Sequence, residues 1–365
     1  MKITDIRLGM LRVPLKTPFK TALRTVDTVQ DVVVQVHTDT GHVGWGEAPA
    51  TAVITGDTHG SIIEAITTCI APRLIGRQVA DLNRNCALVQ SAMVHNSSAK
   101  AAVEIALYDL WAQLHNAPLY RMLGGGEPVI TSDITISVDH IDKMVADSLS
   151  ALDRGFESLK IKVGKDIGLD IERVKAIHAA VDGRALLRLD ANQGWTAKQA
   201  VFAMTALENA GVELELLEQP VKADDIAGLK YVTDRVNTPV MADESAFSPL
   251  QAIDLIQQRA ADIINIKLMK TGGLSNAIRV ADIAALHGVP CMIGCMLESS
   301  ISVAAAVHLA VAKSDVITKV DLDGPSLCAF NPVVGGVNFN ESEISISDAP
   351  GLGIVRVDAL EMLSP

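Results

Sequence analysis

The chain has 365 residues, enough for one large domain and a smaller one, and its 49% hydrophobic content can supply a large core. A formal net charge of −12 argues against binding to nucleic acid or to anionic membranes, both of which require basic patches. The sequence contains no apolar stretch typical of a signal peptide or a membrane span, and its five cysteines form neither a CxxC pair nor a zinc-type spacing. We therefore expect a cytoplasmic protein with reduced thiols.

The first part of the chain, residues 1–125, favours an α+β domain. Three segments predict a strand meander: 6–15, 29–38 and 41–47. Two helices are expected to follow, one over residues 58–74 and a second that opens with Ser97 or Ser98 as its N-cap. The run Gly124 to Gly126 then interrupts the pattern and indicates a boundary.

From residue 126 to 325 a short strand followed by an amphipathic stretch recurs. The predicted strands are 132–138, 158–163, 186–190, 214–218, 240–243, 263–266, 291–296 and 316–321. Eight such units predict an α/β fold built on a parallel (β/α) barrel, a modified TIM barrel. A doubly wound sheet would require a Gly-rich phosphate turn after its first strand, and the sequence has none. Residues 326–365 lack the repeat and are expected to pack on the N-terminal domain as part of an α+β cap.

Polar residues stand at the ends of seven consecutive barrel strands. They are Lys160 and Lys162, Asp190 and Asn192, Glu218, Asp243 and Glu244, Lys267, Glu298, and Asp321 and Asp323. Charged residues are depleted within strands, and the carboxyl ends of barrel strands are where active sites lie. Lys162 is on the second strand and Lys267 on the sixth, so we expect them to face each other across the barrel mouth.

Three of these carboxylates, Asp190, Glu218 and Asp243, end adjacent strands. Like charges that converge stay ionised only if a cation neutralises them. Oxygen ligands without Cys or His select a hard ion, so we expect Mg²⁺, with Ca²⁺ or Mn²⁺ as the weaker possibilities. The alternative is an acidic pocket without a metal.

The lysines suit proton transfer. Burial, a second lysine and a nearby metal ion each lower a lysine pKa, and Lys160 with Lys162 forms such a pair. Two lysines on opposite faces of one carbon permit a 1,1-proton transfer: one removes an α-proton and the other returns it, while a metal stabilises the enediolate between the steps. For Lys160 the alternative is a structural ion pair.

Six short motifs carry a family resemblance. They are Ser158-Leu-Lys160-Ile-Lys162-Val-Gly164, Leu189-Asp190-Ala-Asn192-Gln-Gly-Trp195, Leu217-Glu218-Gln-Pro220, Ala242-Asp243-Glu244-Ser245, Asn265-Ile-Lys267 and Met296-Leu-Glu298-Ser299. With them the chain resembles, over essentially its whole length, the muconate lactonizing subgroup of the enolase superfamily, whose enzymes pair a lysine or histidine base with Mg²⁺.

The resemblance implies a (β/α)7β barrel capped by the N-terminal segment and the C-terminal tail, and one Mg²⁺ per site. It implies that Asp190, Glu218 and Asp243 hold the metal and that Lys162 and Lys267 are the acid/base groups. It implies that Lys160 and Glu298 polarise the substrate carboxylate. Asn192 and Glu244 are then supporting residues, with Glu244 bonded to Lys267.

Within this subgroup the chain resembles the dipeptide epimerases of the L-Ala-D/L-Glu type. That similarity implies that Asp321 and Asp323 bind the substrate ammonium, although Asp323 could instead only cap the following turn. Arg24, in the segment 19–25, would meet the glutamate side chain, unless it pairs with Asp27 or Asp57. Two further residues are implied to contact substrate: Ile54, in the loop 51–57, and Thr135.

Two departures from the expected pattern bear on specificity. The segment 295–300 has small residues where bulkier ones are expected, and Gly324 stands in place of alanine. Both changes could widen the site and admit a different second residue. The exact dipeptide therefore stays open at the level of sequence.

Other functions fit parts of the pattern. An N-succinylamino acid racemase, an o-succinylbenzoate synthase or a muconate cycloisomerase would use the same site, but their substrates carry no ammonium for Asp321 and Asp323. A Schiff-base lyase would use Lys162 or Lys267 on a carbonyl. An inactive binding protein would lack one of the lysines or metal ligands, and none is missing. The resemblance also implies a homo-oligomer and a role in peptidoglycan peptide metabolism.

Overall fold

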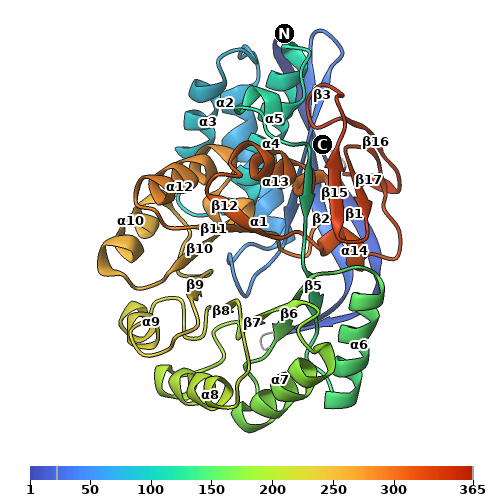
Figure 1. Cartoon of the computed structure of the whole chain (residues 1–365). Coiled ribbons are helices and arrows are strands. Elements are labelled where there is room, and N and C mark those ends of the chain that lie inside the picture. Colours follow the sequence, from blue (N-terminus) through green and yellow to red (C-terminus); the bar gives the residue numbers. More distant parts are fainter. Residues whose placement is uncertain (22–23, 364–365) are drawn as a thin grey trace.

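The structure, a computed structural model, describes residues 1–21 and 24–363 (Figure 1). Its N-terminal part contains an antiparallel sheet in the order β17-β1-β2-β3. The strands are β1 (Ile3–Lys20), β2 (Thr25–Thr38), β3 (Val43–Pro49) and, from the far end of the chain, β17 (Leu360–Met362). The predicted three-stranded meander is confirmed, and the fourth strand shows that the C-terminal tail returns to this sheet.

Helices cover one face of the cap sheet. They are α1 (His59–Glu64), the π-helix η1 (Ala65–Ile70), α2 (Ala71–Leu74), α3 (Leu82–Gln90), α4 (Ser97–Leu114) and α5 (Leu119–Met122). Helix α4 is buried along nearly its whole length and lies directly on β3. Gly46 makes this approach possible, because a Cβ there would stand 1.8 Å from the carbonyl oxygen of Ala102. The sequence did not predict α3, which is short and mostly polar in its first turn.

The predicted N-cap of α4, Ser97 or Ser98, was wrong by one or two residues. Asn96 occupies the cap position with φ 52° and ψ 49°, a left-handed conformation that asparagine tolerates better than serine. Its side chain makes no capping hydrogen bond; instead the Ser98 amide donates to Asp57 Oδ2 over 3.0 Å. An acid from the loop before α1 therefore supplies the cap.

The barrel is an eight-stranded parallel sheet in the order β12-β11-β10-β9-β8-β7-β6-β5. Its strands are β5 (Ile134–Ile136), β6 (Ser158–Lys162), β7 (Leu186–Asp190), β8 (Leu216–Glu218), β9 (Val240–Ala242), β10 (Ile263–Lys267), β11 (Cys291–Gly294) and β12 (Ile317–Asp321). All eight predicted strands are present, most of them a residue or more shorter. The expectation of an α/β barrel with an α+β cap is confirmed.

Helices surround the barrel strands (Figure 1). They are α6 (Ile141–Asp153), α7 (Ile167–Val181), α8 (Ala197–Asn209), α9 (Ile226–Thr233), α10 (Pro249–Gln258), α11 (Leu268–Thr271), α12 (Leu274–Leu286), α13 (Ser300–Ala312) and α14 (Gly324–Leu327). Several begin at side-chain caps, as where Asp166 accepts hydrogen bonds from the amides of Gly168 and Leu169. Among the described residues, none of the helices combines the length and the apolarity of a transmembrane span.

The first and last barrel strands, β5 and β12, are joined by single hydrogen bonds rather than by a paired ladder. The Asp133 amide donates to Val320 O over 3.2 Å, and the Leu322 amide donates to Ser132 Oγ over 2.8 Å. Below the mouth, Arg188 Nη1 donates to Asp133 Oδ2 and to Val320 O across the same seam. The seam lies beside Asp321 at the end of β12 and Asp323 two residues beyond it.

The tail contacts both parts of the molecule. It forms β13 (Val333–Gly335), β14 (Val337–Asn340), β15 (Glu343–Ile346) and β16 (Ile354–Val357). Strand β17 pairs with β1, whereas β15 pairs with the short β4 (Val129–Thr131) that precedes the barrel. The domain boundaries 1–125, 126–325 and 326–365 stay a prediction.

Candidate active site

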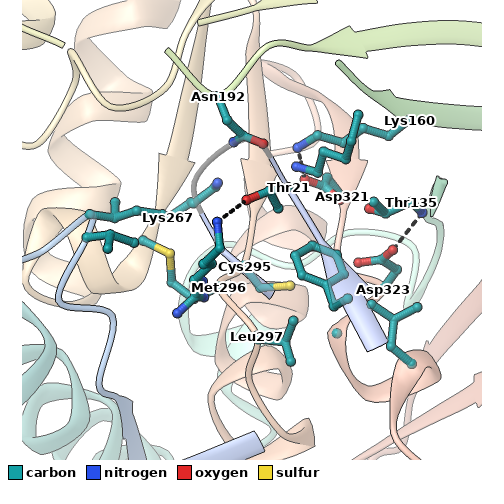
Figure 2. A pocket seen from close by; sticks show the side chains of 17 residues that line it. Thr21, Thr135, Lys160, Asn192, Lys267, Cys295, Met296, Leu297, Asp321 and Asp323 are labelled. Carbon is teal, nitrogen blue, oxygen red and sulfur yellow. Dashed lines mark hydrogen bonds and ion pairs between the residues drawn. The ribbon is translucent and has the colours of Figure 1, made fainter. Parts of the chain in front are cut away.

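A cavity opens at the carboxyl ends of the barrel strands, beneath the first loops of the cap (Figure 2). It is lined by Phe19, Thr21, Arg24, Val53, Ile54, Thr135, Lys160, Lys162, Asn192, Lys267, Cys295, Met296, Leu297, Asp321, Asp323, Gly324 and Leu327. Nine of the predicted site residues thus share one cavity: Arg24, Ile54, Thr135, Lys160, Lys162, Asn192, Lys267, Asp321 and Asp323. The predicted metal ligands lie behind its lining, at the base of the lysines.

Lys162 and Lys267 stand on opposite sides of this cavity. They end β6 and β10, which are four strands apart in the eight-stranded sheet. Lys162 Nζ lies 2.5 Å from Asp190 Oδ2, and Lys267 Nζ lies 2.7 Å from Asp243 Oδ2. Both lysines are almost fully buried, as expected for groups at the bottom of a closed pocket.

Lys160 lies deeper than Lys162 on the same face of β6 and is only 2% exposed. Its Nζ lies 2.6 Å from Asp321 Oδ2, 2.7 Å from Glu218 Oε2 and 3.2 Å from Asp190 Oδ2. One ammonium therefore joins carboxylates from opposite strands of the barrel. In this state Lys160 forms the structural ion pairs that were its alternative role.

The lysine pKa values differ from the expected direction. Burial lowers the pKa of Lys160, but the carboxylates of Asp321, Glu218 and Asp190 outweigh burial and raise it well above its ordinary value. For Lys267, burial is likewise outweighed by Asp243, so its pKa is raised. The reason is that each ammonium here serves as the counter-ion of a carboxylate.

The carboxylates form one strongly interacting group. Burial and the neighbouring Asp190 raise the pKa of Glu218 to about 7, and burial and Asp243 raise that of Glu244 to about 8. Burial also opposes ionisation of Asp190, but Lys162 and Lys160 lower its pKa. The site therefore contains more buried carboxyl groups than its lysines can neutralise.

These residues fit a divalent cation by chemistry. Asp190, Glu218, Asp243 and Glu244 are all buried acids on three adjacent strand ends, and both oxygens of Glu244 lack a hydrogen-bond partner among the described residues. Glu218 Oε2 and Asp243 Oδ1 are approached by lysines but receive no well-directed hydrogen bond. As they stand, no three His, Cys, Asp or Glu side chains within residues 1–21 and 24–363 are arranged as a ready metal-binding group, because the lysines engage these carboxylates.

Two supporting residues can be placed. The Asn192 amide donates to Asp190 Oδ1 over 2.8 Å, and its side chain donates to Asp190 Oδ2 over 3.3 Å, so Asn192 orients that carboxylate. The expected bond between Glu244 and Lys267 was wrong, because Lys267 is engaged by Asp243 instead.

Two more polar residues belong to the group but were not predicted. Asn265 Nδ2 donates to Glu218 Oε1 over 2.8 Å. Lys270 is fully buried in α11, and its Nζ lies 2.6 Å from Asp243 Oδ1 and within hydrogen-bond distance of the carbonyl oxygens of Asp243 and Asn265. A signal for Asn265 existed, since it lies two residues before Lys267 on the same face of β10.

Asp321 and Asp323 end β12 and face the cavity (Figure 2). Asp321 bonds Lys160, whereas Asp323 Oδ2 accepts a hydrogen bond of 2.7 Å from the Thr135 amide on β5. Asp323 occupies the N-cap position of α14 but its side chain makes no capping bond there. Capping is therefore not what holds this carboxylate, and Thr135 contributes its backbone to the site.

The cap loops supply the cavity roof. Arg24 is largely buried, which lowers its pKa, and it forms no ion pair with a described residue; neither Asp27 nor Asp57 is its partner. Residues 22 and 23 of the segment 19–25 lie outside the described residues. Ile54 lines the same side of the cavity from the loop before α1.

Glu298 differs from the expected arrangement. It lies beyond the end of β11, and the cavity lining contains its neighbours Met296 and Leu297 rather than Glu298 itself. Its Oε1 accepts a hydrogen bond of 2.6 Å from the Met296 amide, and its Oε2 accepts one from Ser302 Oγ. The Glu298 carboxyl therefore forms its hydrogen bonds behind the cavity wall instead of projecting into the cavity, as had been expected.

Comparison with known proteins identifies the family. Residues 4–124 match the model of the mandelate racemase / muconate lactonizing enzyme N-terminal domain, and residues 143–359 match that of the enolase C-terminal domain-like family. The L-Ala-D/L-Glu epimerase of Clostridium acetobutylicum is 52% identical over 98% of this chain and 100% of its own length.

Solved structures agree with the sequence matches. The substrate-liganded L-Ala-D/L-Glu epimerase of Bacillus subtilis superposes with a TM-score of 0.96 at 49% identity, covering 98% of this chain and 99% of that one. The dipeptide epimerase of Enterococcus faecalis, complexed with Mg and L-Leu-L-Tyr, gives a TM-score of 0.94 at 40% identity, covering 98% and 100%. The chain therefore belongs to the mandelate racemase / muconate lactonizing enzyme family of the enolase superfamily, and it is similar over its whole length to members named dipeptide epimerases.

Proposed function

We propose that this protein is a Mg²⁺-dependent dipeptide epimerase that moves a proton at the α-carbon of the C-terminal residue, as between L-Ala-L-Glu and L-Ala-D-Glu. The observation that carries the proposal is the placement of Lys162 and Lys267 on opposite sides of one cavity. An α-carbon held between them can lose its proton to one lysine and regain it from the other on the opposite face, with an enediolate between the two steps.

Asp190, Glu218 and Asp243 would hold the Mg²⁺ ion. When bound, the ion supplies the positive charge that retains a substrate carboxylate and stabilises the developing dianion. Lys160 stands between Glu218 and Asp321, so its fixed charge supports the same carboxylate. Asn192 keeps Asp190 in orientation through two hydrogen bonds.

The rest of the cavity suits the two ends of a dipeptide. Asp321 and Asp323 present carboxylates to the substrate ammonium, on the strand that lies opposite β8 and its Glu218. Arg24, with no ion-pair partner among the described residues, is placed to meet the side-chain carboxylate of a glutamate. Similarity to the L-Ala-D/L-Glu epimerases supports this orientation. Peptides released from peptidoglycan are the substrate source that we infer from it.

An N-acylamino acid racemase on the same site is the competing function, and Asp323 distinguishes the two. Asp323→Asn should lower kcat/KM for L-Ala-L-Glu by at least about 100-fold, because an ammonium loses a charged partner. Its effect on N-succinylamino acid substrates, which carry no ammonium, should be small. Activity of the unaltered protein on N-succinylamino acids alone would replace our proposal with the competing one.

A further inference from the structure

Three buried acids, one of them Glu298, meet at the contact between the cap and the barrel, behind the wall of the substrate cavity. Asp31 lies on β2, Glu47 on β3 and Glu298 after β11, and they are exposed by only 2%, 0% and 3%. None forms an ion pair with a described residue. Their surroundings are apolar, since the same face of the cap sheet packs on Leu297 and Ile301. Acids without counter-ions in such a place require another source of stabilisation.

Glu47 receives that stabilisation from the first turn of α13. Its Oε1 accepts a hydrogen bond of 3.1 Å from the Ser299 amide, and its Oε2 accepts bonds from the Ser302 amide (3.1 Å) and Ser302 Oγ (2.9 Å). The free amides and the dipole at a helix N-terminus favour a carboxylate in this position. A side chain of the N-terminal domain therefore stabilises the N-terminus of a 13-residue barrel helix, α13.

Asp31 holds Glu47 from the other side. Strands β2 and β3 are paired with Val33 opposite Glu47, so Asp31, two residues before Val33, lies diagonally beside Glu47 on the same face, and its Oδ2 has no hydrogen-bond partner among the described residues. Because both oxygens of Glu47 already accept hydrogen bonds, a hydrogen bond between the two carboxyls requires the proton to be on Asp31. Burial, Glu47 and Glu298 raise the pKa of Asp31 well above its ordinary value, while Arg24 opposes them. Cys328 is the remaining titratable group close to this pair.

The helix turn that Glu47 caps continues directly into the cavity wall. Ser302 Oγ lies within hydrogen-bond distance of both Glu47 and Glu298, to one of which it donates its single hydrogen, and Glu298 accepts a hydrogen bond from the Met296 amide. Cys295, Met296 and Leu297 line the cavity between Lys267 and Asp321. Leu297 belongs at once to the cavity lining and to the apolar contact with the cap.

We propose that Glu47, held by a hydrogen bond from Asp31, is a positioning residue that fixes the 295–297 wall of the substrate cavity by capping α13 across the contact between cap and barrel. The inference rests on the proposed function for its kinetic consequence, although the positional effect can be measured without it. Lys162 and Lys267 stand on β6 and β10, away from α13. Loss of the hydrogen bonds from α13 to Glu47 should therefore disturb substrate binding more than proton transfer.

The test combines hydrogen–deuterium exchange of the segment 295–303 with kinetics on L-Ala-L-Glu. In Glu47→Gln the new amide group must face one of the two helix amides, so donor meets donor. This variant should exchange faster in that segment and show a KM about tenfold higher, with kcat changed by less than about threefold. Glu64→Gln, which alters an exposed glutamate of α1, is the matched control and should change neither quantity.

Two variants of Asp31 show whether its hydrogen bond to Glu47 matters or only the volume of its side chain. Asp31→Asn keeps a donor toward Glu47 and should behave as the unaltered protein, whereas Asp31→Leu should reproduce the effects of Glu47→Gln. They also keep the inference testable if Glu47→Gln does not fold. Normal exchange and normal KM in Glu47→Gln would overturn the proposal, as would an Asp31→Leu variant indistinguishable from Asp31→Asn. If the unaltered protein acts on no dipeptide, the proposed function fails, yet the exchange measurement still decides the role of Glu47.

Discussion

Lys162 and Lys267 face one cavity from strands four apart, and each is bonded to a different carboxylate, Asp190 at 2.5 Å and Asp243 at 2.7 Å. In Figure 2, Lys160, which lies on β6 like Lys162, and Lys267 of β10 lie on different sides of the pocket. The two lysines are thus equivalent in depth and partner type but opposite in direction. The proton transfer proposed above, with one base on each face of the α-carbon, requires this symmetry.

Removal of either lysine should stop epimerisation. Lys162→Ala and Lys267→Ala should each lower kcat by at least about 1000-fold, since a positioned general base is lost. Mg²⁺ binding, measured by calorimetry, should persist because Asp190, Glu218 and Asp243 remain. Lys143→Ala, on the exposed face of α6, is the control that should keep full activity. Turnover at a normal rate in either active-site variant would refute the assignment of two bases.

The pH dependence of substrate binding should report Asp323. Burial and the neighbouring Asp321 raise the pKa of Asp323 to about 6, so this carboxyl takes up a proton as the pH falls through that value. Its attraction for an ammonium is present above the pKa and lost below it. KM for a dipeptide should therefore rise as the pH falls below about 6, and this rise should be absent in Asp323→Asn. A KM that does not change between about pH 5 and 7 would contradict the role of Asp323.

The main site residues could be predicted from sequence because parallel strands share one rim. Lys162, Asp190 and Lys267 are strand ends, and strand order alone places them around the same mouth. The direction of Glu298 could not be predicted in this way, because it follows three residues of irregular chain after β11. Where a side chain leaves the strand, its target depends on the neighbouring helix, here Ser302 of α13.

The supporting residues were hidden for a different reason. Asp31 and Glu47 lie within antiparallel strands. The alternation of apolar and polar residues in such strands predicts which face is buried, but not what a buried acid contacts. Lys270 stands in a helix of four residues, where a charged side chain ordinarily points to solvent. Glu47 is bonded by Ser299, 252 residues away, and Lys270 reaches Asp243, 27 residues away, so only the folded structure brings these partners near.

Lys270 should contribute strongly to stability. Lys270→Met removes a buried ammonium from Asp243 and removes one hydrogen-bond donor from each of the carbonyl oxygens of Asp243 and Asn265. We expect the free energy of unfolding to fall by about 3 kcal/mol in urea titrations. The control is Lys230→Met, whose partner Asp234 lies on the exposed face of α9, with an expected loss below about 0.5 kcal/mol. Equal losses in the two variants would show that burial of the Lys270 pair adds nothing.

The contact between α4 and the barrel should weaken with rising pH. Glu104 accepts hydrogen bonds from Gln90 and Ser275, and burial raises its pKa to about 7 from an ordinary 4.5. Between these two values the folded protein binds more protons than the unfolded chain, so its stability falls as the pH rises through this window. The loss is on the order of 3 kcal/mol at most. Glu104→Gln should show a flatter dependence between about pH 5 and 8; an unchanged dependence would contradict this.

The most direct test of the central claim is proton NMR of L-Ala-L-Glu in D₂O with the protein and Mg²⁺. We predict that the glutamate α-proton signal disappears while L-Ala-D-Glu resonances grow, that EDTA stops both changes, and that added Mg²⁺ restores them. Exchange with other dipeptides but not with L-Ala-L-Glu would keep the reaction and overturn the role given to Arg24. Absence of α-proton exchange with every dipeptide, in the presence of Mg²⁺, would contradict the proposed epimerase activity.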